Sequence, residues 1–185
     1  MNSTVGDISG NATQIISICH ELADNDDYRF VAFPELSLTG YPPEDLLLRD
    51  DFVSEVEGEL RRIVGAIGEV TAIIGHPHRY SDRLFNAVSV LSQGQVINRY
   101  YKRQLPNYSV FDEKRYFSSG DRPCVVELNG VRIGLTICED MWHDGPVEES
   151  VAAGAEIVIN INASPFSIDK ADQRETHVVS KRAKK

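Results

Sequence analysis

Three residues with complementary chemistry, Glu35, Lys102 and Cys138, each lie at or near the predicted end of a strand. A cysteine attacks a carbonyl carbon only as its thiolate, so it needs a group that accepts the thiol proton. A glutamate and a lysine in a carboxylate-rich, water-poor pocket can hold and return that proton. Because open α/β sheets place their ligand sites at strand ends, this shared placement is the first indication of an enzymatic site.

Apolar periodicity predicts the elements that position these residues. One helical face predicts a helix over about 12–23, which Asn11 would cap, and a second predicts a long helix over 53–67. Short apolar runs predict strands over 29–33, 70–75 and 156–161. The first of these runs ends at Pro34, so Glu35 sits just past a strand end.

Two hairpins are expected in the middle of the chain. One joins residues 85–93 to 95–100 at Gly94, and the other joins 125–128 to 131–137 through Asn129-Gly130. Asn-Gly suits a type I′ turn because both positions need positive φ. Cys138 then falls where the last of these strands ends. A short helix over 146–153 and a charged helix over about 169–183 complete an alternating α/β order, with no linker to divide residues 1–185 into separate domains.

Three blocks of sequence resemble the signatures of the nitrilase superfamily of carbon–nitrogen hydrolases: residues 33–41, 102–117 and 135–140. They contain Glu35, Lys102 and Cys138 in that order. Within the superfamily, residues 41–47 and 105–117 are similar to the glutaminase domain of glutamine-dependent NAD synthetases. The resemblance implies an αββα sandwich.

The resemblance also implies roles. Cys138 would be the nucleophile that forms a thioester with glutamine and releases ammonia, and Glu35 the general base and acid. Lys102 would stabilise the oxyanion together with the backbone N–H of Glu139. Glu113 matches an additional family carboxylate that would orient Lys102; the alternative is a structural ion pair between Glu113 and Arg115.

Glutamine also presents an α-ammonium and an α-carboxylate, which require fixed counter-charges. The residues that correspond to the family's substrate ligands are Tyr108, Glu139, Ser164 and Lys170. Asp169 stands where the family pattern has Gly. Tyr41 and Trp142 are expected to be packing or pocket-wall aromatics.

The resemblance runs from about Thr4 to Arg174 but covers only part of a family domain. We therefore expect an incomplete sandwich, in which the usual first strand and the later strands are missing, and association into a homo-oligomer. Neither a Ser-Gly-Gly-x-Asp-Ser loop nor a G-x-x-x-x-G-K-[ST] loop occurs. ATP and Mg would belong only to an absent synthetase domain, the amidase step needs no cofactor, and the ammonia would serve a synthetase domain or partner.

Composition narrows the class of protein. The 185 residues carry a formal net charge of −9 and three cysteines at wide spacing, without a signal peptide or a membrane-length apolar run. We expect a soluble cytoplasmic protein with reduced thiols. The acidic charge argues against nucleic-acid binding.

Several alternatives remain at this stage. The chain could be a non-catalytic nitrilase-fold subunit, or an amidase for another small amide such as an ω-amide or a carbamoyl compound. A protease-type dyad of Cys138 and His143 lacks an orienting partner. A metal site at His76, His78 and His143 is not expected, because such sites need three or four convergent ligands with carboxylate or thiolate support.

Overall fold

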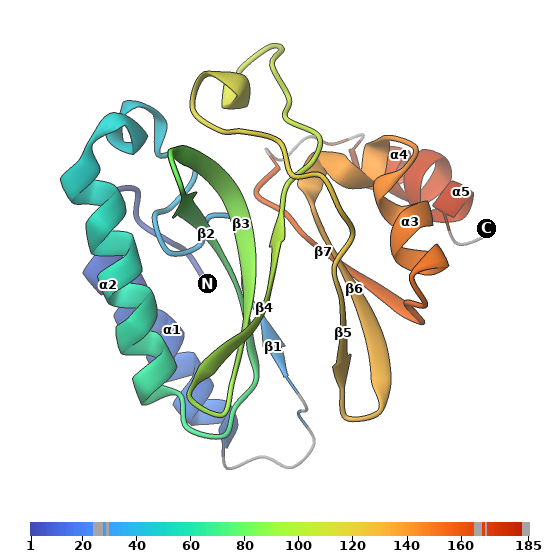
Figure 1. Cartoon of the computed structure of the whole chain (residues 1–185). Helices are drawn as coiled ribbons and strands as arrows, with labels where there is room; N and C mark the ends of the chain where they lie inside the picture. Colours follow the sequence, from blue (N-terminus) through green and yellow to red (C-terminus); the bar gives the residue numbers. More distant parts are fainter. Residues whose placement is uncertain (24–27, 29, 165–167, 169, 183–185) are drawn as a thin grey trace.

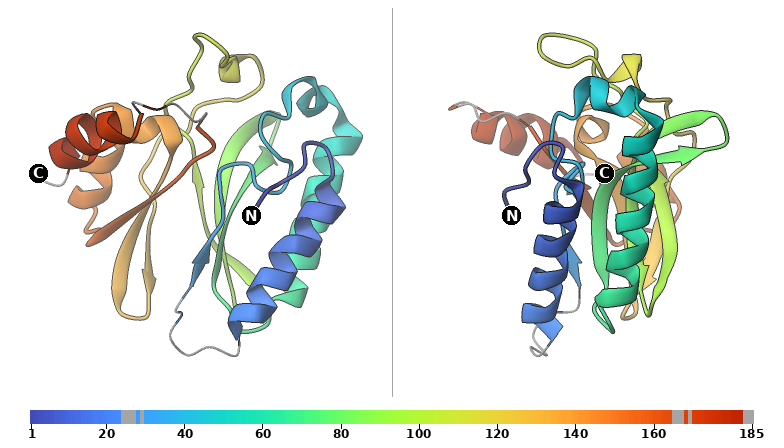
Figure 2. Two further views of the ribbon diagram at one scale, coloured as in Figure 1. Left: turned by 180° about the vertical axis from the view of Figure 1, so that it is seen from behind. Right: turned by 90° about the vertical axis from the view of Figure 1, so that its left-hand side faces the viewer.

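A computed structural model describes residues 1–23, 28, 30–164, 168 and 170–182. Two β-sheets face each other, and helices cover the outer face of each sheet (Figure 1). The turned views in Figure 2 show the same four layers, with the helices of the N-terminal half and those of the C-terminal half on opposite sides. This layered α/β architecture is the one that the sequence predicts.

The first sheet has the strand order β1-β2-β3-β4. The strands are β1 (Val31–Ala32), β2 (Ala72–Tyr80), β3 (Arg83–Ser92) and β4 (Gln95–Tyr101). β1 runs parallel to β2, and the other pairs are antiparallel. Helices α1 (Ile8–Ala23) and α2 (Asp50–Ala66) pack on its outer face.

The second sheet has the order β5-β6-β7. It consists of β5 (Val125–Leu128), β6 (Val131–Ile137) and β7 (Ile157–Ile161), with β7 parallel to β6. Its outer helices are α3 (Pro146–Ala152), α4 (Lys170–Gln173) and α5 (Ser180–Arg182), and a π-helical segment, Arg174–Val179, joins the last two. Three short 3₁₀ turns lie at Glu44–Leu48, Glu113–Arg115 and Cys138–Trp142.

The alternation of side chains along the strands builds two separate cores. Ile74 and Leu91 face α1 and α2, whereas their neighbours Ile73 and Val90 face the second sheet. Ile133 and Ile137 of β6 complete the core between the sheets. The sheets therefore pack directly on each other, and residues at their ends can meet.

The structure corrects several predicted helix and strand boundaries. α1 begins at Ile8, and Asp7 Oδ1 accepts a hydrogen bond from Gly10 N, so Asn11 is not the cap. Asn11 lies inside the helix and binds the backbone of Thr4 and Leu38 instead. The predicted 29–33 strand is reduced to Val31–Ala32, and its first residue lies outside the described residues.

β2 extends five residues past its predicted end, to Tyr80. The long β2–β3 hairpin pairs Pro77 with Asn86 and closes at Tyr80 and Arg83, so a proline inside the strand did not end it. Both predicted hairpin turns are confirmed, with Asn129 and Gly130 at φ of 51° and 79°. The last predicted helix is confirmed over the described residues 170–182.

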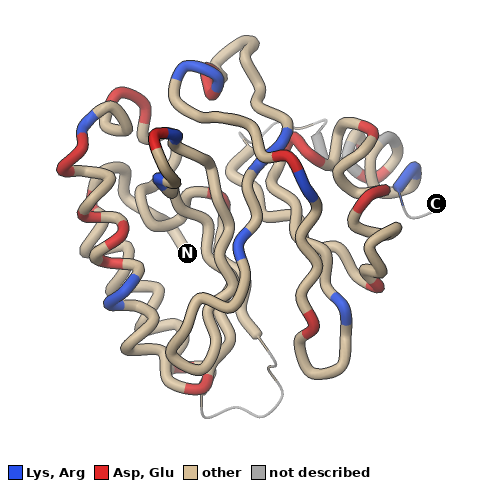
Figure 3. Tube along the Cα trace, in the orientation of Figure 1, with Lys and Arg blue, Asp and Glu red and all other residues tan. Residues whose placement is uncertain are grey.

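Several Asp and Glu residues lie along α2, as Figure 3 shows. Within the described residues, no helix is both long and apolar enough to cross a membrane.

Candidate active site

Glu35 lies in the turn that follows β1, and β2 determines where this turn runs. Ser37 Oγ and Leu38 N both donate hydrogen bonds to Gly75 O at 3.2 Å. A Cβ atom on Gly75 would come within 2.6 Å of Leu36 N and within 2.8 Å of Glu35 Cα. Only a glycine in β2 lets the turn approach this closely, so Gly75 fixes the position of the Glu35 backbone.

Lys102 directly follows β4, and its ammonium group joins two carboxylates. Nζ lies 2.7 Å from Glu35 Oε1 and 2.7 Å from Glu113 Oε1. All three side chains are buried, with Lys102 only 1% exposed. A buried charge is stable only when it is paired, and this lysine is paired twice. The alternative of a structural ion pair between Glu113 and Arg115 is not what the structure has, because Arg115 contacts Asp45 at 3.2 Å.

Charge and burial set the protonation of this group. Burial alone would lower the pKa of Lys102, but Glu35 and then Glu113 outweigh it and raise that pKa. Burial raises the pKa of Glu113 to about 7, against the opposing effect of the Lys102 charge. Lys102 is therefore an ammonium at neutral pH, and Glu113 titrates near neutrality.

Cys138 ends β6 and begins the 3₁₀ turn Cys138–Trp142. Its backbone is left-handed, with φ at 45°, and Sγ lies 3.3 Å from Ser164 Oγ. Burial and then the Glu35 carboxylate raise the pKa of the thiol to about 12, although the Lys102 charge lowers it. The thiol is thus electrostatically coupled to both Glu35 and Lys102, and at neutral pH it is protonated.

Two further groups hold Glu35, and the sequence did not reveal them. Asn86 Nδ2 donates to Oε1 at 2.8 Å, and the backbone N–H of Ala163 donates to Oε2 at 3.1 Å. Asn86 lies on β3, where its backbone carbonyl oxygen accepts a hydrogen bond from Lys102 N. Only the register of the β3–β4 pairing could have linked Asn86 to the Lys102 strand end.

Tyr108 and Glu139 come together at the rim of the site. Tyr108 Oη donates to both carboxylate oxygens of Glu139 at 3.1 Å. The Glu139 carboxylate also contacts His143 Nε2 at 3.1 Å. All three residues line a cavity of about 370 Å³ that also contains Arg103 and Lys114.

Ser164 lies beside Cys138, so a third predicted substrate ligand is near the thiol. The side chain of Lys170 and the whole of Asp169 lie outside the described residues.

The family model for carbon–nitrogen hydrolases matches residues 1–184. The chain belongs to the carbon–nitrogen hydrolase family. It is 41% identical over 184 residues to a glutamine-dependent NAD(+) synthetase from Aquifex aeolicus and 44% identical over 174 residues to one from Xylella fastidiosa. These alignments cover 98% and 92% of this chain but 32% of each relative, so the chain spans about a third of their length.

Solved structures agree with this assignment. A glutamine-dependent NAD+ synthetase from Acinetobacter baumannii, in complex with ADP, superimposes with a TM-score of 0.89 at 32% identity, over 95% of this chain and 33% of that one. An amidase from Nesterenkonia sp. superimposes with a TM-score of 0.84 over 98% of this chain and 68% of that one, at 21% identity, and so shares the fold. The predicted family, fold class and enzyme class are confirmed.

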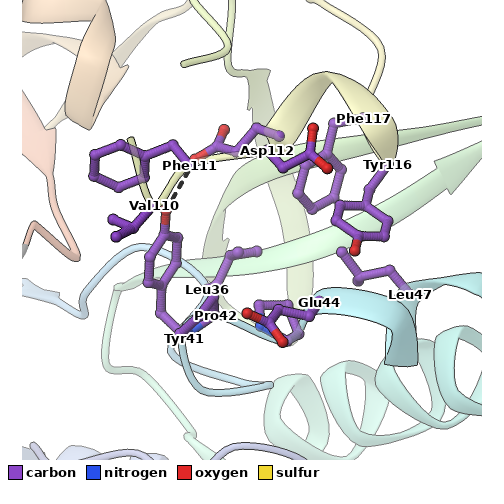
Figure 4. Close-up of a pocket in the computed structure, with 12 residues that line it drawn as sticks. Leu36, Tyr41, Pro42, Glu44, Leu47, Val110, Phe111, Asp112, Tyr116 and Phe117 are labelled. Atoms are coloured by element: carbon purple, nitrogen blue, oxygen red, sulfur yellow. Dashed lines mark hydrogen bonds between the residues drawn. The ribbon is translucent and has the colours of Figure 1, made fainter. Parts of the chain in front are cut away.

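A second, smaller cavity of this carbon–nitrogen hydrolase has a volume of about 170 Å³. Figure 4 shows Tyr41, Phe111 and Tyr116 around it, with Leu36 at its base. Glu113 also lines the cavity, and Tyr41 Oη donates to Glu113 Oε1 at 3.3 Å. Tyr41 is thus a pocket-wall residue, as predicted, and it also contacts the carboxylate that holds Lys102.

The histidines of β2 lie in a network of their own in this hydrolase. His76 contacts Ser89 Oγ and Pro77 O at 2.8 Å each, and His78 contacts Arg99 and Tyr101. Burial lowers the pKa of His76 to about 3. Among the described residues, no three His, Cys, Asp or Glu side chains converge in a way that would hold a metal ion.

Proposed function

We propose that this chain is a glutamine amidohydrolase that works through a thioester on Cys138. The observation that supports the proposal most strongly is the double ion pair of Lys102 beside the Cys138 thiol. It brings a nucleophile, a base and a cation into one buried site, as acyl transfer requires. The names of the relatives support glutamine as the amide donor.

The hydrogen bonds of Glu35 indicate which oxygen accepts the thiol proton. Oε1 accepts from Lys102 and Asn86, so both of its lone pairs are used. Among the described residues Oε2 accepts only from Ala163 N, which leaves it one lone pair. Glu35 Oε2 therefore takes the proton as Cys138 Sγ attacks the amide carbon, and it then returns the proton to the departing ammonia.

Lys102 stabilises the negative oxygen that this attack creates. Its ammonium has three N–H donors, and two of them point to Glu35 and Glu113. Among the described residues the third has no acceptor, so it is left for the oxyanion, and the backbone N–H of Glu139 is the second donor. Loss of one such donor typically costs about 10²–10³ in rate.

Water then completes the cycle. Glu35 takes a proton from a water molecule as that water attacks the thioester carbon. The thiolate leaves, accepts the proton from Glu35, and glutamate is released. The overall reaction converts one glutamine and one water into one glutamate and one ammonia.

Recognition of an amino-acid amide depends on the cavity at the rim. The Glu139 carboxylate, held by Tyr108, supplies the negative charge that an α-ammonium requires. Ser164 and Lys170 complete the proposed ligand set. An amidase for simple amides has no need of a fixed carboxylate in this position, and this favours glutamine.

Ammonia release tests the proposal. The chain should release equal amounts of ammonia and glutamate from glutamine, and it should act poorly on propionamide, which lacks both α-groups. Cys138→Ala should abolish turnover without changing the far-UV circular dichroism spectrum. Cys124 is also a buried cysteine, and Cys124→Ala should retain turnover. Turnover by Cys138→Ala would overturn the nucleophile assignment.

We further propose that the ammonia serves NAD synthesis by a synthetase domain or partner, consistent with the names of relatives three times as long as this chain. The amidase step itself needs no cofactor, and ATP and Mg belong to the synthetase reaction. Isotope transfer tests the handoff. Amide-¹⁵N glutamine mixed with a synthetase and its substrates should give ¹⁵N-labelled product even with excess unlabelled ammonium, and full dilution of the label would exclude a direct handoff.

A further inference from the structure

Asp140 carries a buried carboxylate that lies outside the proposed catalytic group. It is 0% exposed, and it accepts four hydrogen bonds. Oδ2 accepts from Ile137 N at 3.0 Å and from Tyr100 Oη at 2.8 Å. Oδ1 accepts from Arg103 N at 3.0 Å and from Gln104 N at 2.8 Å. Each oxygen thus accepts two hydrogen bonds, which is the full acceptor capacity of the carboxylate.

The four donors flank the two reactive residues. Ile137 immediately precedes Cys138, and Arg103 and Gln104 immediately follow Lys102. Tyr100 belongs to β4, in the first sheet, whereas Ile137 ends β6, in the second. Asp140 therefore ties the end of the Lys102 strand to the end of the Cys138 strand across the sandwich.

Asp140 also stabilises the backbone of the nucleophile. Cys138 has a φ of 45°, a left-handed conformation that is unfavourable for a residue with a Cβ. The bond from Ile137 N to Asp140 Oδ2 closes a turn around Cys138 and holds it in this conformation. A residue in such a conformation persists only where the surrounding contacts enforce that conformation, and the Asp140 carboxylate supplies one of these contacts.

We infer that Asp140 is a positioning residue, which fixes Cys138 Sγ relative to Lys102 Nζ and Glu35. The inference rests on the proposed function for its kinetic consequences but on the geometry alone for its effect on the thiol. A displacement of about 1 Å at a reacting group can cost about 100-fold in rate, so loss of this tie should lower activity even in a variant that folds.

Substitution of Asp140 by Asn separates positioning from simple packing. An amide has nearly the same shape, but one of its two ends donates. It therefore leaves either the Ile137 and Tyr100 donors or the Arg103 and Gln104 donors without an acceptor. Tyr100→Phe is a milder change that removes one donor and keeps the carboxylate. Asp82→Asn, at an exposed position in the β2–β3 turn, is the matched control.

Two readouts are measured on each variant after circular dichroism has shown that it is folded. For glutamine hydrolysis, Asp140→Asn should lower kcat about 100-fold with little change in KM, Tyr100→Phe should lower it less, and Asp82→Asn should not. For iodoacetamide alkylation, peptide mapping gives the rate at Cys138 as a function of pH. The wild-type rate should keep rising to the highest pH that the fold tolerates. The Asp140→Asn rate should level off at a lower pH than this, because a displaced thiol is less buried and lies farther from Glu35, the two causes of its raised pKa.

A folded Asp140→Asn with wild-type kcat and a superimposable alkylation profile would overturn the inference, even if its melting temperature falls. If Asp140→Asn does not fold, Tyr100→Phe decides the matter, and an unchanged kcat and profile would again overturn it. Alkylation needs no glutamine. If the wild type fails to hydrolyse glutamine while the profile still shifts in the variants, then the proposed substrate is wrong and the positioning role stands.

Discussion

At the scale of single residues, each member of the proposed catalytic group has one task. In the proposed mechanism Glu35 moves the proton, Lys102 holds the oxyanion and Cys138 forms the bond. Glu35→Gln and Lys102→Ala should therefore each prevent the thioester from accumulating when the reaction with glutamine is quenched in acid and analysed by intact mass. Lys102→Ala should also lower turnover by about 10²–10³. A normal thioester level in either variant would contradict the role of that residue.

Glu113 makes the stability of the protein depend on pH, and the sign of this dependence follows from its raised pKa. Burial raises the pKa of this carboxyl in the folded protein to about 7 from an ordinary value of 4.5. The folded state thus binds the proton more tightly than the unfolded state, so the contribution of Glu113 to stability is complete below pH 4.5 and is lost as the pH rises through 7.

Urea unfolding between pH 4.5 and 8 measures this contribution. The free energy of unfolding of the wild type should contain a component that falls over this range, and Glu113→Gln should lack that component because its amide does not titrate. Parallel pH profiles for the two proteins would show that Glu113 does not titrate near neutrality.

At the scale of elements, the close approach of β2 to the Glu35 turn allows a test that changes none of the reacting side chains. A methyl group at position 75 has no room against Leu36 N and Glu35 Cα. Gly75→Ala should therefore displace Glu35 and cost about 100-fold in turnover. Gly65→Ala is the matched control, since a Cβ at position 65 of α2 meets no atom within 4 Å. That variant should be as active as the wild type and more stable by about 0.5–1 kcal/mol.

The elements also show what could be predicted from sequence. The hairpin around Asn129-Gly130 and the position of Cys138 at its end were predictable, because turn chemistry is local. So was the long amphipathic α2. The start of α1 was not, since Asp7 was available as a cap and Asn11 has a tertiary role that no local pattern reports.

In the candidate site, too, some residues could be predicted from local sequence and others only from tertiary contacts. The trio could be found from blocks of sequence. Asn86 lies outside these blocks, and Asp140 ends the third block without any local sign of its role. Their contacts cross from β3 to the Glu35 turn and from the turn after β6 to β4, and such contacts depend on register and on the packing of two sheets.

At the scale of the whole molecule, strands β4 and β7 lie at sheet edges and carry exposed apolar side chains, with Ile97 44% and Ile157 52% exposed. Such edges pair readily with another chain. We predict that the purified chain is a dimer or larger in multi-angle light scattering, and that Ile157→Lys shifts it toward monomer. A monomer at every concentration would contradict this prediction.

The site itself is assembled by the whole sandwich, because Glu35, Lys102 and Glu113 come from the first sheet and its loops and Cys138 from the second. If Cys138 is the nucleophile of a glutamine site, a diazo-ketone analogue of glutamine should alkylate it, and intact mass and peptide mapping measure this. We predict a single adduct, located on Cys138, whose formation glutamine slows and propionamide does not. An adduct on Cys19 or Cys124, or labelling of Cys138 that glutamine leaves unchanged, would contradict the account.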